Sequence, residues 1–288
     1  MNEYKNNNLV FILIFSFLVL LLATTILNAQ AYTKEEMKDS ISKLPYFSIH
    51  KNNYFISGVP TNKSISRTTA DAKYQISFKQ ILTRSKLPWD TYLFLTYTQK
   101  AFWNVYKESF PFSDINFNPS LALGKAFYDK NNRLKGIGRL SFEHESNGRD
   151  SIFSRTWNRI SLEYATKIRK NTIANLKVWI PFLDQENNPD LLEFVGLGEL
   201  SLSHIIKPNK WIADIRFRKG LNFEAKGSIR SRLYFNPFKN NVSNQYIMLE
   251  WFVGQAEGLL NYRQSKSTIR IGYVVRTNEF KWLKGKPN

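Results

Sequence analysis

The chain of 288 residues contains no cysteine and only three histidines, His50, His144 and His204. The missing cysteines exclude disulfide bonds as a source of stability. The motifs H-E-x-x-H and G-x-S-x-G and a phosphate-cradling glycine loop are also absent, so the common signatures of zinc proteases, α/β-hydrolases and nucleotide-binding sites are not found. His204 lies near the end of an alternating segment, which is typical of a membrane-interface histidine, and His50 has no candidate partner.

Long apolar runs are absent after the first 31 residues. Lys5 lies in a short polar start, residues 9–23 are apolar apart from one serine, and a small-residue site, Ala-Gln-Ala, follows at 29–31. This order is typical of a secretory signal peptide. The alternative is a membrane-anchoring helix, which needs roughly 20 apolar residues. We therefore predict a signal peptide over residues 1–31, cleaved after Ala31, and no second membrane-spanning helix.

Acidic residues are scarcer than basic ones. The chain has 23 Asp and Glu and 41 Lys and Arg, which gives a formal net charge of +18. On an exported protein such a basic surface suits anionic, phosphate-bearing partners such as lipid headgroups or lipopolysaccharide. Nucleic acid is a poor candidate partner because the chain is predicted to be secreted and no nucleic-acid-binding motif is present.

From about residue 54 onward, apolar and polar residues alternate with the period of a β-strand. Leu140 and Phe142, for example, alternate with Arg139, Ser141 and Glu143. Turn-forming residues separate about twelve such segments, near 54–59, 70–82, 91–105, 117–128, 136–146, 157–168, 171–180, 195–206, 211–218, 227–235, 245–255 and 267–277.

Two architectures produce this pattern on an exported chain, a soluble sandwich and an outer-membrane barrel. Many segments are long enough to cross a bilayer when tilted, their number is even, and aromatic residues, Trp157 and Trp179 among them, recur near strand ends. The face opposite the apolar one carries Arg139, Glu143, Arg159, Glu163, Lys177, Glu199, Arg216 and Arg270, which we expect to point into a lumen. We predict an all-β fold, a 12-stranded antiparallel transmembrane β-barrel of outer-membrane type over residues 54–288, with residues 32–53 as an N-terminal periplasmic arm.

Polar residues interrupt the apolar face of one predicted hairpin. His144 and Ser146 project from the same side of their strand as Phe142. If residues 147–155 form the connecting loop, His144 lies opposite Asn158 of the next strand. Ser146 as nucleophile, His144 as general base and Asn158 as the residue that orients the imidazole would form a catalytic triad. The alternative is a non-catalytic hairpin end at the membrane–water boundary, where His, Ser and Asn side chains are hydrated. The three residue types alone favour this alternative.

The string HESNGRDSIFSRTWNR, residues 144–159, resembles the active-site segment of the outer-membrane phospholipase A family, H-D-S-N-G-R followed after a short loop by S-R-S-W-N-R. Further segments resemble the family in the same order: YTQKAFW at 97–103, ESFPF at 108–112, NFNP at 116–119 and NNPDL at 187–191. The resemblance therefore covers most of the chain after residue 31. It favours the catalytic triad over a hydrated, non-catalytic hairpin end.

This resemblance implies a calcium-dependent hydrolase of glycerophospholipid acyl esters (A1/A2-type), active as a homodimer in the outer membrane. It assigns Ser146, His144 and Asn158 the roles given above. It implies calcium ligands at the carbonyl of Arg149 and at Ser154 of one subunit, and at the position of Ser109 from the partner subunit. Gln99 matches a polar dimer-interface position of the family.

Some positions depart from the family pattern. Glu145 replaces an Asp, and we expect this change to be tolerated because the side chain points to the other face. The loop reads Arg149-Asp150-Ser151 where the family often has Arg-Ser-Asp, so its carboxylate lies one position earlier. Asn187 replaces an Asp that is a second calcium ligand in the family, so we expect an uncharged amide oxygen there. The segment FKWLKGKPN at 280–288 lacks a terminal aromatic. The alternatives are a non-catalytic outer-membrane barrel or porin and, less favoured, a soluble esterase sandwich.

Overall fold

A computed structural model of the chain describes residues 31–83, 87–183, 186–221, 224–238, 243–277 and 280–285. The predicted signal peptide therefore lies outside the described residues except for Ala31. The strands are β1 (Phe47–Ile49), β2 (Asn53–Pro60), β3 (Asp71–Ile81), β4 (Thr91–Trp103), β5 (Phe112–Tyr128), β6 (Leu134–Ser146), β7 (Thr156–Arg169), β8 (Thr172–Leu183), β9 (Gly198–Lys207), β10 (Trp211–Lys219), β11 (Gly227–Phe235), β12 (Gln245–Gly254) and β13 (Lys266–Val275). The helical segments are α2 (Lys34–Ser42), α3 (Leu192–Val195), η1 (Pro88–Asp90), η2 (Ser151–Phe153) and η3 (Lys281–Lys284).

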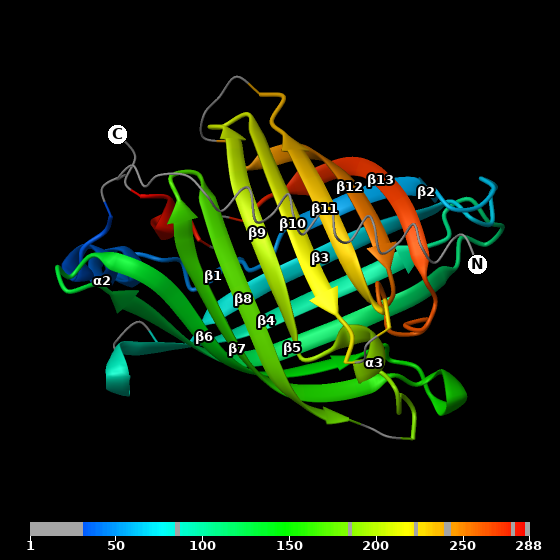
Figure 1. The fold of residues 1–288 in the computed structure, drawn as a ribbon, viewed down its shortest axis with the longest axis horizontal. Helices are drawn as coiled ribbons and strands as arrows, with labels where there is room; N and C mark the ends of the chain where they lie inside the picture. Colours follow the sequence, from blue (N-terminus) through cyan, green and yellow to red (C-terminus); the bar gives the residue numbers. More distant parts are fainter. Residues whose placement is uncertain are drawn as a thin grey trace.

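Twelve of these strands, β2 to β13, form a closed antiparallel barrel (Figure 1). Each strand pairs with its neighbours in sequence, and β13 pairs with β2 to close the ring. The short β1 pairs with the far end of β3, beyond the part that β2 covers. The prediction of a 12-stranded antiparallel barrel is confirmed, and the predicted strand segments all overlap observed strands.

Among the described residues, no helix is both long enough and apolar enough to cross a membrane.

The two faces of each strand differ as the alternation predicts. Leu140 and Phe142 of β6 are 47% and 53% exposed on the outer surface. Between them and on either side, Arg139, Ser141 and Glu143 point into the lumen, where Glu143 is buried. Inward charges are expensive in a low-dielectric interior unless they are paired. The charged residues predicted to face the lumen are accordingly joined in ion pairs.

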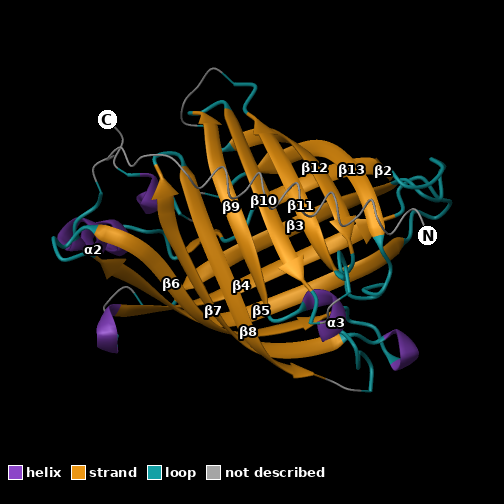
Figure 2. Ribbon diagram, viewed as in Figure 1, coloured by secondary structure: helices purple, strands orange, loops and turns teal. Residues whose placement is uncertain are grey.

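The two ends of the barrel differ in the length of their connections. The turns at 129–133, 170–171 and 208–210 are short and lie at the end that also carries α2 and η3. The opposite end carries longer loops, 104–111, 147–155 and 255–265 among them, and α3 (Figure 2). Outer-membrane barrels likewise have short turns at one end and long loops at the other.

Apolar side chains close both ends from within. At the long-loop end a buried cluster contains Trp157, Trp179, Leu191, Phe194, Val195, Leu259 and Tyr262. At the short-turn end a second cluster joins Met37 of α2 to Leu283 of η3. Trp157 and Trp179, which the sequence suggested as strand-end aromatics, therefore lie inside the barrel and not in an external aromatic belt.

The predicted periplasmic arm, residues 32–53, contains α2 and β1. A capping box begins α2: the Thr33 hydroxyl accepts the backbone N–H of Glu36, and the Glu36 carboxylate accepts that of Thr33, at 3.3 and 2.9 Å. Met37 of the helix is buried against the barrel. Helix α2 is thus packed onto the short-turn end.

The seam between β2 and β13 depends on two glycines. A Cβ atom on Gly58 would lie 1.9 Å from the Ile269 carbonyl oxygen, and one on Gly272 would lie 2.2 Å from that of Phe55. Such contacts are too short for any side chain. The strands that close the ring therefore approach more closely at these positions than a residue with a Cβ would allow.

Candidate active site

The β6–β7 hairpin carries the three candidate catalytic residues on its outer face. His144 pairs in register with Asn158, and Ser146 with Thr156. His144 Nδ1 lies 2.9 Å from Asn158 Oδ1. An amide oxygen can only accept a hydrogen bond, so His144 Nδ1–H is the donor, and the lone pair of Nε2 is left for use as a base.

Ser146 lies two residues beyond His144 on the same outer face, in register with Phe117 of β5. Within the part of the chain that the structure describes, no hydrogen bond joins its Oγ to His144. Catalytic hydrogen bonds are often long in ligand-free structures and tighten when substrate binds. The structure thus brings the side chains of His144 and Asn158 into contact and places Ser146 on the same face.

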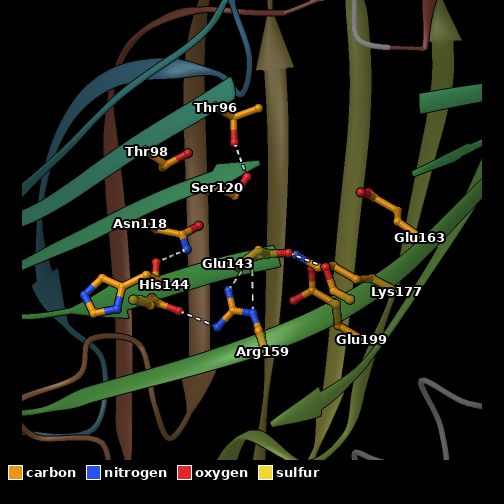
Figure 3. A network of polar contacts seen from close by, with 12 residues as sticks. Thr96, Thr98, Asn118, Ser120, Glu143, His144, Arg159, Glu163, Lys177 and Glu199 are labelled. Carbon is orange, nitrogen blue, oxygen red and sulfur yellow. Dashed lines mark hydrogen bonds and ion pairs between the residues drawn. The ribbon is translucent and has the colours of Figure 1, made fainter. Parts of the chain in front are cut away.

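Ion pairs between side chains fix the inner face of the same hairpin. Arg159 contacts Glu143 at 2.7 Å and Glu145 at 2.8 Å, and Lys177 of β8 contacts Glu143 at 2.5 Å. Figure 3 shows the His144 ring pointing away from this luminal network, while the backbone carbonyl of His144 accepts a bond from the Asn118 amide of β5. Contacts on the luminal side therefore fix the strands that carry the three candidate residues.

Asn147 organises the loop that follows Ser146. Its Oδ1 accepts the backbone N–H of Arg155 at 2.9 Å and that of Arg149 at 3.4 Å, and its Nδ2 donates to the Phe153 carbonyl at 2.9 Å. The side chain is only 4% exposed. Asn147 matches the family pattern in sequence, but its role is visible only in the folded loop, which brings its partners together.

The predicted calcium ligands Arg149 and Ser154 lie in this loop. The Arg149 guanidinium donates to the Ser113 carbonyl at 3.0 Å, which ties the loop to β5. The Arg149 carbonyl and the Ser154 hydroxyl form no hydrogen bond with any residue in the described ranges. Both oxygens are thus free for another ligand, and neutral oxygens of this kind suit Ca²⁺.

Ser109 and Asn187 lie in neighbouring loops. Ser109 is exposed in the 104–111 loop, with a left-handed backbone (φ 61°), and forms no hydrogen bond with Arg149 or Ser154 among the described residues of one chain. Asn187 precedes the buried Asn188, whose Oδ1 accepts the backbone N–H of Thr156 at 3.0 Å. The loop that carries Asn187 therefore contacts the start of β7, opposite Ser146.

Asp190, Tyr262 and Arg263 form a polar cluster, called the clasp below. It joins the loop between β8 and β9 to the loop between β12 and β13. The Arg263 guanidinium contacts the Asp190 carboxylate through two bonds of 2.8 Å, and the Tyr262 hydroxyl donates to the same carboxylate. The Arg263 guanidinium and the Tyr262 hydroxyl lower the pKa of Asp190. Burial and the Asp190 carboxylate raise the pKa of Tyr262 to about 12. The guanidinium of Arg155 lies 5.9 Å from the Tyr262 ring centroid, so the clasp reaches the hairpin loop.

His50 and His204 lie away from this site. His50 is buried between β1 and β2, and His204 is exposed near the end of β9, where its Nδ1 lies 2.8 Å from the Thr172 hydroxyl. Across the described ranges, no group of three or more His, Asp or Glu residues is arranged to hold a metal ion.

Comparison with known proteins relates the whole barrel to one family. The family model described as Phospholipase A1 matches residues 31–275. The phospholipase A1 of Escherichia coli K12 is 30% identical over 209 residues, which cover 71% of this chain and 69% of that protein. The phospholipase A1 of Salmonella typhimurium is 26% identical over 287 residues, covering 88% and 96%. A Neisseria meningitidis relative is 28% identical over 216 residues, which span 71% of this chain and 54% of its own length.

Solved structures share the fold. A calcium-bound dimer of the Salmonella typhi outer membrane phospholipase superposes with a TM-score of 0.71 at 21% identity, covering 83% of this chain and 96% of that one. The outer membrane phospholipase A of Escherichia coli gives a TM-score of 0.70 at 20% identity, covering 81% and 99%. These likenesses support the same barrel architecture.

Proposed function

The chain belongs to the phospholipase A1 family and is a phospholipase, and we propose that it hydrolyses the acyl ester bonds of glycerophospholipids (A1/A2-type) with a triad of Ser146, His144 and Asn158. The observation that carries this proposal is the 2.9 Å contact between His144 Nδ1 and Asn158 Oδ1 on the outer face of the barrel, with Ser146 beside it. In lipid, polar groups on this face are costly unless they are hydrogen-bonded, as His144 and Asn158 are to each other.

In the proposed reaction, Ser146 Oγ attacks the ester carbonyl carbon while His144 Nε2 accepts the hydroxyl proton. Asn158 keeps the imidazole in the required tautomer and orientation. The tetrahedral intermediate collapses with cleavage of the ester C–O bond, and the departing lysophospholipid oxygen takes the proton from His144. Water then attacks the acyl-enzyme with His144 again as base, so that a fatty acid leaves and the Ser146 hydroxyl is restored.

We propose Ca²⁺ as the cofactor, held by the Arg149 carbonyl and the Ser154 hydroxyl together with Ser109 of the partner subunit. The two oxygens without hydrogen-bond partners in a loop fixed by Asn147 support this assignment. When bound, the ion would supply positive charge next to the developing oxyanion. Asn187 is a second proposed ligand, and its uncharged amide oxygen predicts weaker binding there.

A homodimer in the outer membrane is the proposed working state. The apolar outer surface and the short turns at one end suit that membrane, and the Salmonella typhi neighbour was solved as a dimer with bound calcium. Gln99 lies on the outer face, where its amide contacts the hydroxyls of Tyr97 at 2.9 Å and Tyr74 at 3.4 Å. Residues 1–31 remain a proposed signal peptide, and residues 32–53 a proposed periplasmic segment.

The test compares wild type with Ser146→Ala in mixed micelles of phospholipid and detergent at millimolar calcium. We expect the variant to lose hydrolysis while its heat-modifiable gel mobility shows an intact barrel, and we expect EDTA to silence the wild type. Hydrolysis by Ser146→Ala at the wild-type rate would overturn the triad. Absent hydrolysis in the folded wild type, together with single-channel conductance, would instead support a non-catalytic barrel or porin.

A further inference from the structure

The barrel lumen contains a cavity whose wall is strongly basic. The cavity has a volume of about 270 Å³ and extends from the aromatic cluster around Trp157 and Trp179 to Lys284 at the short-turn end. Eleven lysines and arginines line it, against four aspartates and glutamates. Glu143 and Glu250 lie just outside this lining set and pair with lining cations. Even with these two carboxylates counted, the cations remain in excess by five.

The excess positive charge is concentrated on adjacent strands. Ser201 of β9 lies opposite Arg216 of β10, and Arg216 lies opposite Arg230 of β11. All three side chains line the cavity. Arg216 shares the carboxylate of Glu199 with Arg218, at 3.3 and 3.1 Å. One carboxylate therefore serves two guanidinium groups.

Three lining cations, Lys51, Lys100 and Arg230, form no ion pair with a carboxylate among the described residues. Lys100 instead donates to the backbone carbonyl of Glu257. Lys51 lies between β1 and β2, where Lys177, Arg139 and Arg216 repel its charge and Glu143 attracts it. Like charges placed directly opposite in a sheet are destabilising. Their repulsion is stronger in a lumen surrounded by bilayer than in water.

A bound anion would offset part of this excess positive charge. Guanidinium groups bind tetrahedral oxyanions through paired N–H donors, and an ammonium adds a point charge. The Ser201 hydroxyl accepts the Arg216 Nε–H at 3.2 Å, which leaves its own proton for donation. A water molecule occupies roughly 30 Å³ of liquid volume, so the cavity has room for a small oxyanion with several waters.

We propose that the luminal cavity is a binding site for one small oxyanion of the phosphate or sulfate class, held by Arg230, Arg216 and Lys51. This site faces the interior of the barrel, whereas His144 and Ser146 face the lipid. It is therefore separate from the proposed hydrolytic site, and the two can be tested independently.

The test uses the purified, detergent-solubilised full barrel with inorganic phosphate as the probe. Equilibrium dialysis with radiolabelled phosphate gives the stoichiometry, and intrinsic fluorescence gives the thermal midpoint in phosphate and in chloride at equal ionic strength. Arg230→Gln and Lys51→Gln are the test variants. Arg67→Gln, in the exposed 61–70 loop, removes the same charge outside the cavity and is the matched control.

We expect wild type and Arg67→Gln to bind one phosphate per chain saturably, with a rise in thermal midpoint that chloride does not produce. Arg230→Gln should bind phosphate at least tenfold more weakly. In chloride its midpoint should equal or exceed that of the wild type, since one repelling charge is gone. Continued hydrolysis of micellar phospholipid would show that Arg230→Gln is folded. If Arg230→Gln does not fold, the phosphate affinity of Lys51→Gln is compared with that of the wild type instead. Unsaturable binding to wild type, or unchanged affinity in the folded variants, would overturn the proposal.

Discussion

The contact between His144 and Asn158 predicts how much activity depends on the third member of the triad. At 2.9 Å it is a well-formed hydrogen bond. A bond of this kind between neutral groups contributes about 1 kcal/mol, and about 1.5–3 kcal/mol when one partner is charged. The imidazole becomes positively charged as it takes the Ser146 proton, so the bond is strongest in the transition state.

Asn158→Ala should therefore lose about 1.5–3 kcal/mol of transition-state stabilisation, which corresponds to a fall of about 10- to 150-fold in kcat. KM should change little, because Asn158 contacts His144 and not the substrate. Asn158→Asp retains an acceptor oxygen and should be faster than the alanine variant. The assay is fatty acid release from mixed micelles, with kcat and KM measured separately.

The control is Ile160→Ala, the next outward position on the same strand, which lies opposite Phe142 and not opposite His144. It should hydrolyse phospholipid at close to the wild-type rate. A kcat for Asn158→Ala within twofold of wild type would refute the reasoning. So would a defect confined to KM.

Three further predictions concern the surroundings of the site. Asn147→Ala should retain the barrel but lose most activity, and need more calcium to restore it, because three bonds that fix the loop are lost; a calcium titration of activity checks this. Arg159→Leu leaves the buried Glu143 with one cation fewer and should lower the free energy of unfolding by about 3 kcal/mol. Urea titration in detergent measures this loss, and an unchanged free energy of unfolding would show that water in the lumen screens the charge. Asp190→Asn removes the carboxylate paired with Arg263, whose guanidinium lowers the pKa of Asp190. That pair stabilises the fold above the unfolded pKa of about 4. The gap in thermal midpoint between wild type and Asp190→Asn should therefore be widest near neutral pH and close as the pH falls below about 4.

Strand parity explains how much of the site could be predicted. A strand has only two faces, so placing Phe142 outside also placed His144 and Ser146 outside, and the hairpin length set Asn158 opposite His144. The same rule indicated that Trp157 points inward with Arg159. Its position near a strand end is also typical of an external aromatic belt, but the alternation along β7 decides in favour of the lumen.

Other features depended on contacts that no local pattern contains. The role of Asn147 arises from partners up to eight residues away, which meet only when the loop closes. β1 is three residues long and has no periodicity to detect. For α2 a local signal existed, since Thr33 and Glu36 form the T-x-x-E spacing of a capping box. The basic luminal cavity required knowledge of which strands are adjacent.

The glycine-lined seam has a consequence for biogenesis. Every other strand pairing in the barrel joins strands that leave the ribosome one after the other, whereas the eight residue pairs between β2 and β13 join positions 208 to 222 residues apart. Contacts of such long range form late. Until they do, both outermost strands present unpaired amides that hydrocarbon cannot solvate. The incomplete sheet therefore needs an aqueous or chaperoned environment up to its final step, and a bulky residue at Gly58 or Gly272 should arrest maturation there and leave the rest of the hairpin series intact.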